Sequence, residues 1–531
     1  MSLHSSDTLL DSMRDPAFYP HPTVHNIQVI HTHISTVFLT GEFAYKIKKP
    51  VNFGFLDFTQ LADRKHFCNE ELRLNRRLAP ALYLDVAPIL YKDGRYQLGT
   101  PSTATSGDIV EYAVKMRQFD PQQQLDLLLA AGSLPVDDMD VLARNITRFH
   151  QNIEIAAENS RFGLPAKVLE PMQQNFALLR THLHDPAILK RLSLLESWTQ
   201  QEYSRVQGRL LQRKHEGHIR ACHGDMHLGN IAVVDGEITI FDGIEFNEDL
   251  RWIDTASEVA FLLMDLAYRH APTHAHRLLN RYLETGGDYG LLTVLNFYSV
   301  YRAMVRAKVN ALRLGQNPSD EERGLALQQC TDYLTLAEKY THTARPALFI
   351  THGLSGSGKS SGCRELCDAL GFIQLRSDVE RKRLLDMQAT ERRTEGLDQG
   401  IYSVEMSART YDRLEELSRV ALQNHFSVVV DATFLDAGQR QRFRQLAQEQ
   451  DAAFLILHFS GTPAQLEANI LRRQQANTDA SDADIAVLHK QLEQYKPLQD
   501  DEPCVTVPPN ECLPISTLQA HLSRLGVKNA S

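Results

Sequence analysis

The sequence has no long apolar run, no paired-cysteine motif and no excess of basic residues. Its longest apolar stretch, VAFLLMDLAY, is interrupted by Asp265 and is well short of the roughly 20 residues that span a bilayer. None of the seven cysteines forms a CxxC pair, which favours buried thiols in a reducing compartment over a disulfide framework. The formal net charge of -10 argues against a protein whose main task is to coat nucleic acid.

The first residues, MSLHSSDTLLDSMRDPAFYPHP, also lack the basic segment and apolar core of a secretory signal. We therefore expect a cytoplasmic protein without a membrane partner. No internal repeat is found, and 43% hydrophobic with 23% charged residues is typical of globular proteins. A length of 531 residues predicts several structural units rather than a single core.

The first part of the chain is rich in predicted strands, and the part after Pro121 in predicted helices. HISTVFLTGEFAYKIKK predicts a hairpin that turns at Thr40-Gly41-Glu42. The charged segment that follows, DRKHFCNEELRLNRRLA, has loosely helical spacing. Further strands are predicted at 87–91, 95–100 and 109–119, and a strand-rich region at 219–242 interrupts the later helices.

The pattern changes again near residue 344, where Pro346 marks a predicted domain boundary. Beyond it, five apolar runs alternate with helical segments, which is typical of a parallel sheet covered by helices. The five runs are ALFIT, FIQLR, SVVVDA, AFLILHF and CVTV.

The first of these runs leads into GLSGSGKSS, which matches the phosphate-binding pattern GxxxxGK[ST]. Glycines let backbone amides surround a phosphate, Lys359 neutralises β/γ charge, and the Ser360 hydroxyl suits Mg²⁺. A flexible Gly/Ser turn is the alternative, and the flanking strand and helix count against it. The predicted ATP-binding residues are Gly353, Leu354, Ser355, Gly356, Ser357, Gly358, Lys359, Ser360 and Ser361.

Two carboxylates follow later runs of the same module. Asp378 ends the second run, where it suits a catalytic base for a hydroxyl acceptor, with a helix N-cap as the alternative role. Asp431 ends SVVVDA, the place where P-loop proteins hold Mg²⁺ or its water. Arg472 and Arg473, before the polar stretch QQANTDASDAD, are the predicted lid residues. Arg440, Arg442 and Arg444 precede them, and of these five arginines most are expected to be solvated and only one or two to act on the phosphate.

Taken together, residues 345–510 resemble the small P-loop kinases related to polynucleotide kinase, zeta toxin and gluconate kinase. The resemblance rests on GLSGSGKS, RSD, VVVDAT and the arginine-bearing segment. It implies nucleotide binding and a kinase activity, and it does not name the hydroxyl that is phosphorylated.

A second constellation lies in ACHGDMHLGNIAVVDGEITIFDG, far ahead of that loop. A two-residue turn at Asp235-Gly236 predicts a hairpin whose open end brings Asn230 and Asp242 together as a Mg²⁺ pair. Asp225, in the loop that enters the hairpin, remains as a carboxylate for proton transfer. Zinc binding by His223 and His227 is the alternative, which the neighbouring glycines disfavour.

HGDMHLGN followed by IFDG resembles the catalytic loop and metal aspartate of the aminoglycoside phosphotransferase and choline kinase superfamily. The resemblance implies that Asp225 is the catalytic base, that Asn230 and Asp242 hold Mg²⁺, and that His223 shapes the loop. The first lobe should then supply a phosphate-binding lysine and a helical glutamate. Lys46 fits the lysine and Glu71 its partner, with Lys48 and Glu70 as the respective alternatives. The missing GxGxxG loop favours this superfamily over protein kinases.

Over nearly its full length the chain resembles the bacterial two-module proteins described as bifunctional aminoglycoside phosphotransferase/ATP-binding proteins. The resemblance implies an N-terminal bilobal, protein-kinase-like α+β domain at 1–343, with a small β-rich lobe at about 25–120 and a helical lobe at about 121–343. An α/β P-loop kinase-like NTPase domain with a parallel sheet follows at 344–531.

The predicted function is an ATP- and Mg²⁺-dependent phosphotransferase with two nucleotide sites, each acting on a hydroxyl of a small molecule. In one alternative, one module is a nucleotide-binding regulator of the other. In a second, the C-terminal module phosphorylates nucleic-acid 5′-hydroxyls, which the acidic net charge disfavours. Neither acceptor nor the oligomeric state follows from the sequence.

Overall fold

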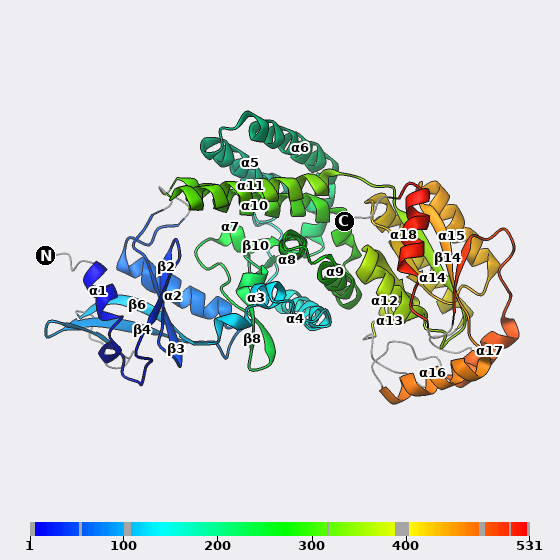
Figure 1. Cartoon of the computed structure of the whole chain (residues 1–531), viewed down its shortest axis with the longest axis horizontal. Coiled ribbons are helices and arrows are strands. Elements are labelled where there is room, and N and C mark those ends of the chain that lie inside the picture. The colour runs from blue at the N-terminus through cyan, green and yellow to red at the C-terminus, as the bar shows by residue number, and fades with distance from the viewer. Residues whose placement is uncertain are drawn as a thin grey trace. The chain divides into compact units, whose positions relative to one another are not determined.

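The computed structural model describes residues 6–52, 56–99, 108–315, 318–387, 403–476, 484–508 and 511–527. The chain forms two compact units (Figure 1). Unit 1 comprises Met1–Leu134, Arg148–Lys167 and Leu211–Leu262, and unit 2 comprises Pro135–Thr147, Val168–Leu210 and Leu263–Ser531. Unit 2 thus contains residues on both sides of position 344, and the domain boundary there stays a prediction. In the described part of the chain no helix is long and apolar enough to cross a membrane.

Unit 1 contains a six-stranded antiparallel sheet in the order β1-β2-β3-β6-β4-β5. The predicted turn at Thr40-Gly41-Glu42 is confirmed, because it joins β2 to β3 as an antiparallel pair. The strands are β1 Gln28–His31, β2 Ser35–Leu39, β3 Phe43–Lys48, β4 Tyr83–Lys92, β5 Arg95–Leu98 and β6 Ile109–Arg117.

The two faces of β3 have different roles because side chains alternate along a strand. Tyr45 and Ile47 are buried in an apolar cluster that includes Met13 and Phe18, from the segment with α1 (Ser6–Ser12) and η1 (Pro16–Phe18). Lys46 and Lys48 are directed to the other face, towards α2 (Leu61–Asn75).

A second, two-stranded hairpin carries the catalytic-loop sequence. β8 (Ile231–Val234) and β9 (Glu237–Ile240) pair with Val234 opposite Glu237, which confirms the predicted register. Asp235 and Gly236 both adopt positive φ, the conformation that a two-residue hairpin turn of this type requires. The surrounding elements of unit 1 are η2 Pro121–Gln123, α3 Leu125–Ala130, β7 Ile219–Ala221, η3 Leu228–Asn230, α7 Glu248–Arg251 and β10 Trp252–Asp254.

The predicted helices after Pro121 are present, and the predicted fold class of the N-terminal part is confirmed. Four of these helices contribute residues to both units, namely α4 Asp138–Asn152, α5 Pro165–His182, α6 Pro186–His215 and α8 Thr255–Tyr268. Unit 2 also contains α9 Pro272–Gly286, η4 Tyr289–Thr293, α10 Leu295–Leu314 and α11 Asp320–Thr341.

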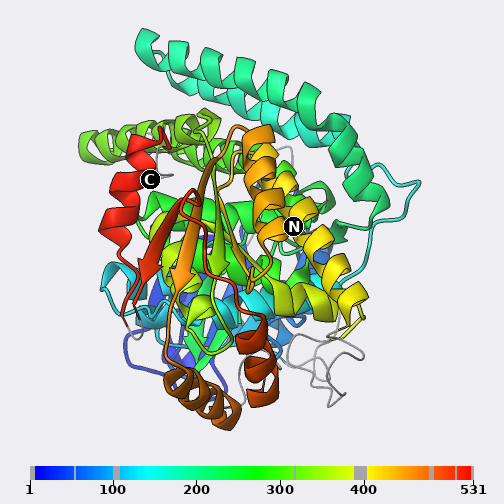
Figure 2. The same ribbon diagram turned by 90° about the vertical axis from the view of Figure 1, so that its right-hand side faces the viewer.

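Unit 2 has a five-stranded parallel sheet in the order β12-β13-β11-β14-β15, which confirms the predicted α/β class (Figure 2). Every residue of β11 and β13 is buried, as expected for strands covered on both faces. The strands are β11 Ala347–His352, β12 Ile373–Arg376, β13 Val428–Asp431, β14 Ala453–Phe459 and β15 Cys504–Val507. The helices are α12 Lys359–Leu370, α13 Ser377–Arg383, α14 Val404–Gln423, α15 Ala437–Glu449, α16 Pro463–Ala476, α17 Ile485–Gln494 and α18 Ile515–Arg524.

Candidate active sites

In unit 1, one glutamate of α2 bridges both lysines of β3. Lys46 Nζ lies 2.9 Å from Glu71 Oε1, and Lys48 Nζ lies 2.8 Å from Glu71 Oε2. Each lysine also pairs with a carboxylate of the segment after β9, Lys46 with Asp242 and Lys48 with Glu245. Five alternating charges therefore form one continuous chain from Asp242 to Glu245.

Exposure distinguishes the two lysines. The Lys46 side chain is 10% exposed and its partner Asp242 is 44% exposed, whereas Lys48 is 0% and Glu245 is 5% exposed. A ligand can therefore reach the Lys46 end of the chain of charges, while the Lys48 end is enclosed. Glu70, the alternative to Glu71, instead pairs with Arg73 on the outer side of α2. The geometry favours Lys46 and Glu71 among the sequence candidates.

The same contacts stabilise the ionised forms of Lys46 and Glu71. Burial alone would lower the pKa of Lys46, but the neighbouring Asp242 and Glu71 raise it well above the usual value. Burial would raise the pKa of Glu71, and the two lysines instead lower it to about 2. The paired lysines and Glu71 therefore stay ionised at neutral pH.

The predicted base Asp225 and the predicted metal ligand Asn230 lie side by side. Asn230 Nδ2 donates to the Asp225 carbonyl oxygen at 3.0 Å and to its Oδ2 at 3.2 Å. The Asn230 carbonyl in turn accepts the Phe241 N–H at 2.9 Å, which fixes the residue that precedes Asp242. Asp225 is 39% exposed, and it can therefore meet a substrate.

His223 joins the two halves of this site. Its Nδ1 accepts the Asp225 N–H at 3.3 Å, and its Nε2 donates to the Phe241 carbonyl at 2.8 Å. Burial lowers the pKa of His223, which favours the neutral ring that this pair of bonds requires. Because both ring nitrogens are engaged inside the loop, zinc binding by His223 and His227 has no support in the geometry.

A buried glutamate that the sequence reasoning missed holds the loop from behind. Glu258 of α8 accepts the His223 N–H at 2.7 and 2.9 Å and the Gly224 N–H at 3.4 Å. Gly224 has φ +90°, and a Cβ there would lie 2.7 Å from the Leu250 carbonyl oxygen. His150 Nε2 lies 3.6 Å from Glu258. His150, Glu258 and Cys222 form a compact buried group. Because the Glu258 carboxylate accepts hydrogen bonds from the His223 and Gly224 amides, it fixes the backbone of this loop.

The residues at the front of this site suit a hard cation. Asp242 offers a partly exposed carboxylate, and Asn230, whose backbone carbonyl binds the N–H of the residue before Asp242, offers an amide oxygen; oxygen donors of these kinds are preferred by Mg²⁺. Lys46 is at the same place and suits the phosphates of a nucleotide.

In unit 2, the loop between β11 and α12 has the shape of a phosphate cradle. Gly353, Gly356 and Gly358 all have positive φ. A Cβ at Gly353 would lie 2.5 Å from the Phe459 carbonyl oxygen, so only glycine fits there. The loop ends at Lys359, the first residue of α12, whose Nζ donates to the Leu354 carbonyl at 2.7 Å.

Asp431, at the end of β13, meets the beginning of that helix. Burial raises the pKa of its carboxyl, while Arg376, a hydrogen bond with Ser360 and the charge of Lys359 oppose the rise. Burial likewise lowers the pKa of Lys359, against the attraction of Asp431 and Asp378. The Ser360 hydroxyl and the Asp431 carboxylate together form an oxygen donor pair that fits Mg²⁺.

Asp378 lies inside the first turn of α13 rather than at its cap. The helix begins at Ser377 with Arg376 as N-cap, so the N-cap alternative is wrong. The Asp378 side chain is 26% exposed and pairs with Arg381 at 2.8 Å. Asp378 follows β12 directly, at the same edge of the parallel sheet as Asp431 at the end of β13.

The arginines of this module have different environments. Arg440 is buried and binds Glu502 and the carbonyls of Phe434 and Leu435, a structural role. Arg473 on α16 is close enough for its charge to lower the pKa of Lys359. The remaining three contact neighbours at the surface: Arg442 pairs with Glu415, Arg444 with Asp501, and Arg472 donates to Asn469. Residues 477–483 of the predicted lid-like segment lie outside the described residues.

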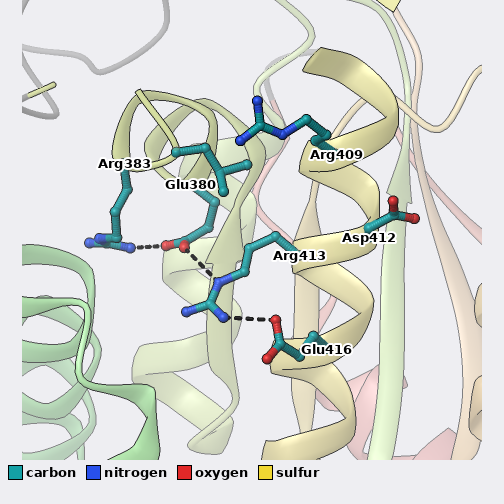
Figure 3. Close-up of a pocket in the computed structure, with 7 residues that line it drawn as sticks. Glu380, Arg383, Arg409, Asp412, Arg413 and Glu416 are labelled. Atoms are coloured by element: carbon teal, nitrogen blue, oxygen red, sulfur yellow. Dashed lines mark hydrogen bonds and ion pairs between the residues drawn. The ribbon is translucent and has the colours of Figure 1, made fainter. Parts of the chain in front are cut away.

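A charged pocket of about 420 Å³ lies between α13 and α14 of unit 2 (Figure 3). Buried Glu380 pairs with Arg383 and is 3.8 Å from Arg413, which also pairs with Glu416 at 2.8 Å. Opposite charges thus largely neutralise one another here. The lining residues are Glu380, Arg383, Leu384, Arg409, Asp412, Arg413 and Glu416.

Comparison with protein families matches residues 348–498 to an AAA domain. Among curated proteins, the uncharacterized proteins Rv2004c of Mycobacterium tuberculosis and Mb2027c of Mycobacterium bovis are each 31% identical over 461 residues, covering 87% of this chain and 89% of theirs.

Among solved structures, similarity is found to an ethanolamine kinase of Plasmodium vivax, at 10% identity over 62% of this chain and 89% of that one, with a TM-score of 0.38. A gluconokinase of Sinorhizobium meliloti matches at 21% identity over 34% of this chain and 95% of that one, with a TM-score of 0.25. An aminoglycoside 2′-phosphotransferase in complex with GDP matches at 12% identity over 63% of this chain and 99% of that one, with a TM-score of 0.37.

Proposed function

We propose that this chain, which belongs to the same family as the mycobacterial proteins Rv2004c and Mb2027c, is an ATP- and Mg²⁺-dependent phosphotransferase with two nucleotide sites. One observation carries the proposal above all others. Each unit holds its own buried phosphate lysine beside a carboxylate suited to Mg²⁺, Lys46 with Asp242 in unit 1 and Lys359 with Asp431 in unit 2. Two such sets support nucleotide binding by both units, and the transfer experiment below separates a second enzyme from a nucleotide-binding regulator.

At the unit 1 site, Lys46 would bind the α/β-phosphates of ATP while Glu71 holds the lysine in place. Asn230 and Asp242 would hold Mg²⁺, which when bound neutralises charge on the phosphates. Asp225 would take the proton of the acceptor hydroxyl as that oxygen attacks the γ-phosphorus, while the bond from this phosphorus to the β,γ-bridging oxygen breaks and ADP leaves. His223 and Asn230 keep the Asp225 backbone and carboxylate in position.

At the unit 2 site, the loop amides and Lys359 would bind the β- and γ-phosphates, and Ser360 with Asp431 would hold Mg²⁺. Asp378 is the candidate base for a second acceptor hydroxyl. Helix α16 contacts the loop through Asn469, which donates to the Gly356 carbonyl at 2.9 Å, and we propose that Arg473 of this helix stabilises the transferring phosphate.

The acceptors we propose are small molecules with a free hydroxyl. Phosphorylation of nucleic-acid 5′-hydroxyls by unit 2 is the second candidate, favoured by the arginines near its lid and opposed by the net charge of -10. An oligonucleotide that stimulates ATP turnover, and that binds less tightly as salt rises, would select this second candidate.

A metabolite-pool screen with labelled ATP tests the proposal on the full chain. The wild type should transfer label to at least one hydroxyl compound. Asp225→Asn should remove one product and Lys359→Ala another, each leaving the other product unchanged. If one variant removes all transfer and the other removes none, the module that carries the silent variant is a regulator and not an enzyme. If the wild type neither binds nor turns over MgATP, the proposal fails.

A further inference from the structure

Helix α9, which precedes the P-loop segment by some sixty residues, covers the open edge of its sheet. β12 is an edge strand and would otherwise expose unpaired peptide groups. Asn280 of α9 supplies the missing partner: its Nδ2 donates to the Phe372 carbonyl at 2.8 Å, and its Oδ1 accepts the Gln374 N–H at 2.7 Å. The side-chain amide thus replaces a neighbouring strand.

A second contact follows one helical turn later. Glu284 Oε1 accepts a hydrogen bond from Arg376 Nη1 at 2.9 Å. Residues 280 and 284 are separated by a helical rise of about 6 Å, and residues 374 and 376 by about 6.6 Å along a strand. The spacing of residues 280 and 284 along α9 therefore matches the spacing of residues 374 and 376 along β12, so both contacts can form at once.

The side chains of Gln374 and Arg376 both extend to the carboxylate of Asp431, the proposed Mg²⁺ ligand. Gln374 Nε2 donates to Asp431 Oδ2 at 3.2 Å, and Arg376 Nε lies 3.7 Å from the same oxygen. All three charged groups are enclosed, with side-chain exposures of 9% for Arg376, 15% for Glu284 and 5% for Asp431. Arg376 is thus a single cation shared between a carboxylate of α9 and the carboxylate of the phosphate site.

Further contacts fix α9 at this edge. Arg277 pairs with Asp368 near the end of α12, with Nε 2.9 Å from Oδ1. Arg383 Nη2 donates to the Glu284 carbonyl at 2.6 Å and also binds Glu380 in the charged pocket (Figure 3). Glu284 is therefore held through its backbone as well as its side chain.

We propose that α9 is a functional part of the P-loop site, and that Glu284 is a positioning residue that acts through Arg376 on Asp431. The proposal rests on the nucleotide site proposed for unit 2. With Glu284 present, Arg376 is held by two carboxylates and approaches Asp431 at only 3.7 Å, which leaves Asp431 available to Mg²⁺. Without Glu284, Arg376 pairs fully with Asp431 and competes with the cation.

The test measures nucleotide binding to the full chain by calorimetry across a Mg²⁺ titration, with Lys46→Met as background so that only the unit 2 site is observed. Glu284→Gln should raise the Mg²⁺ concentration for half-maximal binding roughly tenfold, the effect typical of losing a group that orients a metal ligand. Binding without Mg²⁺ should hardly change. Glu338→Gln, which removes the partner of Arg191 in an ion pair between α11 and α6, is the matched control and should leave the Mg²⁺ dependence as in the background.

A double-variant cycle separates this role from general packing. If Glu284 acts through Arg376, Glu284→Gln should have no further effect on Mg²⁺ dependence in an Arg376→Gln background. Additive effects, or an unchanged Mg²⁺ dependence in Glu284→Gln, would overturn the inference while the nucleotide site stands. Absence of MgATP binding in the Lys46→Met background would overturn both. Should Glu284→Gln melt early, Glu284→Asp, which keeps the charge, is measured in the same cycle.

Discussion

Replacing Lys48 by methionine should destabilise unit 1 much more than replacing Lys46, although the two lysines share one strand face and one glutamate. Lys48 is 0% exposed and its partner Glu245 is 5% exposed, so the change leaves a buried carboxylate without its cation. Breaking such a buried pair costs about 3 kcal/mol or more. After Lys46→Met, in contrast, Asp242 is 44% exposed and can be solvated, and Glu71 keeps Lys48. We expect a loss of about 1 kcal/mol there.

For a unit of this size, 1 kcal/mol shifts the melting midpoint by roughly 3 °C, so Lys48→Met should lower it by about 10 °C and Lys46→Met by about 3 °C. Trp252 lies in unit 1 and Trp198 in unit 2, so a Trp198→Phe background makes fluorescence report on unit 1 alone. Phosphate transfer by unit 1 should follow the opposite order, since Lys46→Met removes the phosphate lysine that lies beside the partly exposed Asp242. Equal melting shifts, or unit 1 transfer that survives Lys46→Met, would refute the reasoning.

Three further predictions concern single groups. Asp225→Asn should lower kcat of the unit 1 reaction roughly 10²-fold or more with the KM for ATP unchanged, measured by labelled transfer; an equal change in KM would argue against a base. Lys359→Ala should abolish MgATP binding to unit 2 and leave unit 1 transfer intact, checked by calorimetry. Glu71 has a folded pKa of about 2 against 4.5 when unfolded, so its stabilisation is complete above pH 4.5 and is lost as the pH falls towards 2. The melting midpoint of Glu71→Gln should therefore be lower at pH 7 but fall less steeply below pH 4.5, and parallel profiles would contradict this.

Local patterns predicted the elements and the phosphate loop well. The Asp235-Gly236 turn and GLSGSGKSS depend on backbone conformations that neighbouring residues dictate, and β11 follows from one apolar run. The sequence alone could not decide which of Lys46 and Lys48 binds phosphate, because both side chains lie on the same face of β3. It depends on which carboxylate of a distant segment, Asp242 or Glu245, each lysine meets.

The sequence also failed to identify residues that hold a site in place from a distant helix, because their roles depend on long-range packing. Glu258 and Glu284 lie on helices without any motif, and a helical glutamate on its own is most often a solvated charge. Only the packing of α8 behind His223, and of α9 beside Arg376, gives these carboxylates a role. For Asp378 the sequence left two roles open, a base and a helix N-cap, and only the position at which α13 begins excludes the cap.

The most direct test of two nucleotide sites is the binding stoichiometry of a non-hydrolysable ATP analogue with Mg²⁺, measured by calorimetry on the full chain. The account predicts two molecules per chain for the wild type, with one lost in Lys46→Met and the other lost in Lys359→Ala. Binding of a single molecule to the wild type, or the loss of all binding in either variant alone, would contradict it.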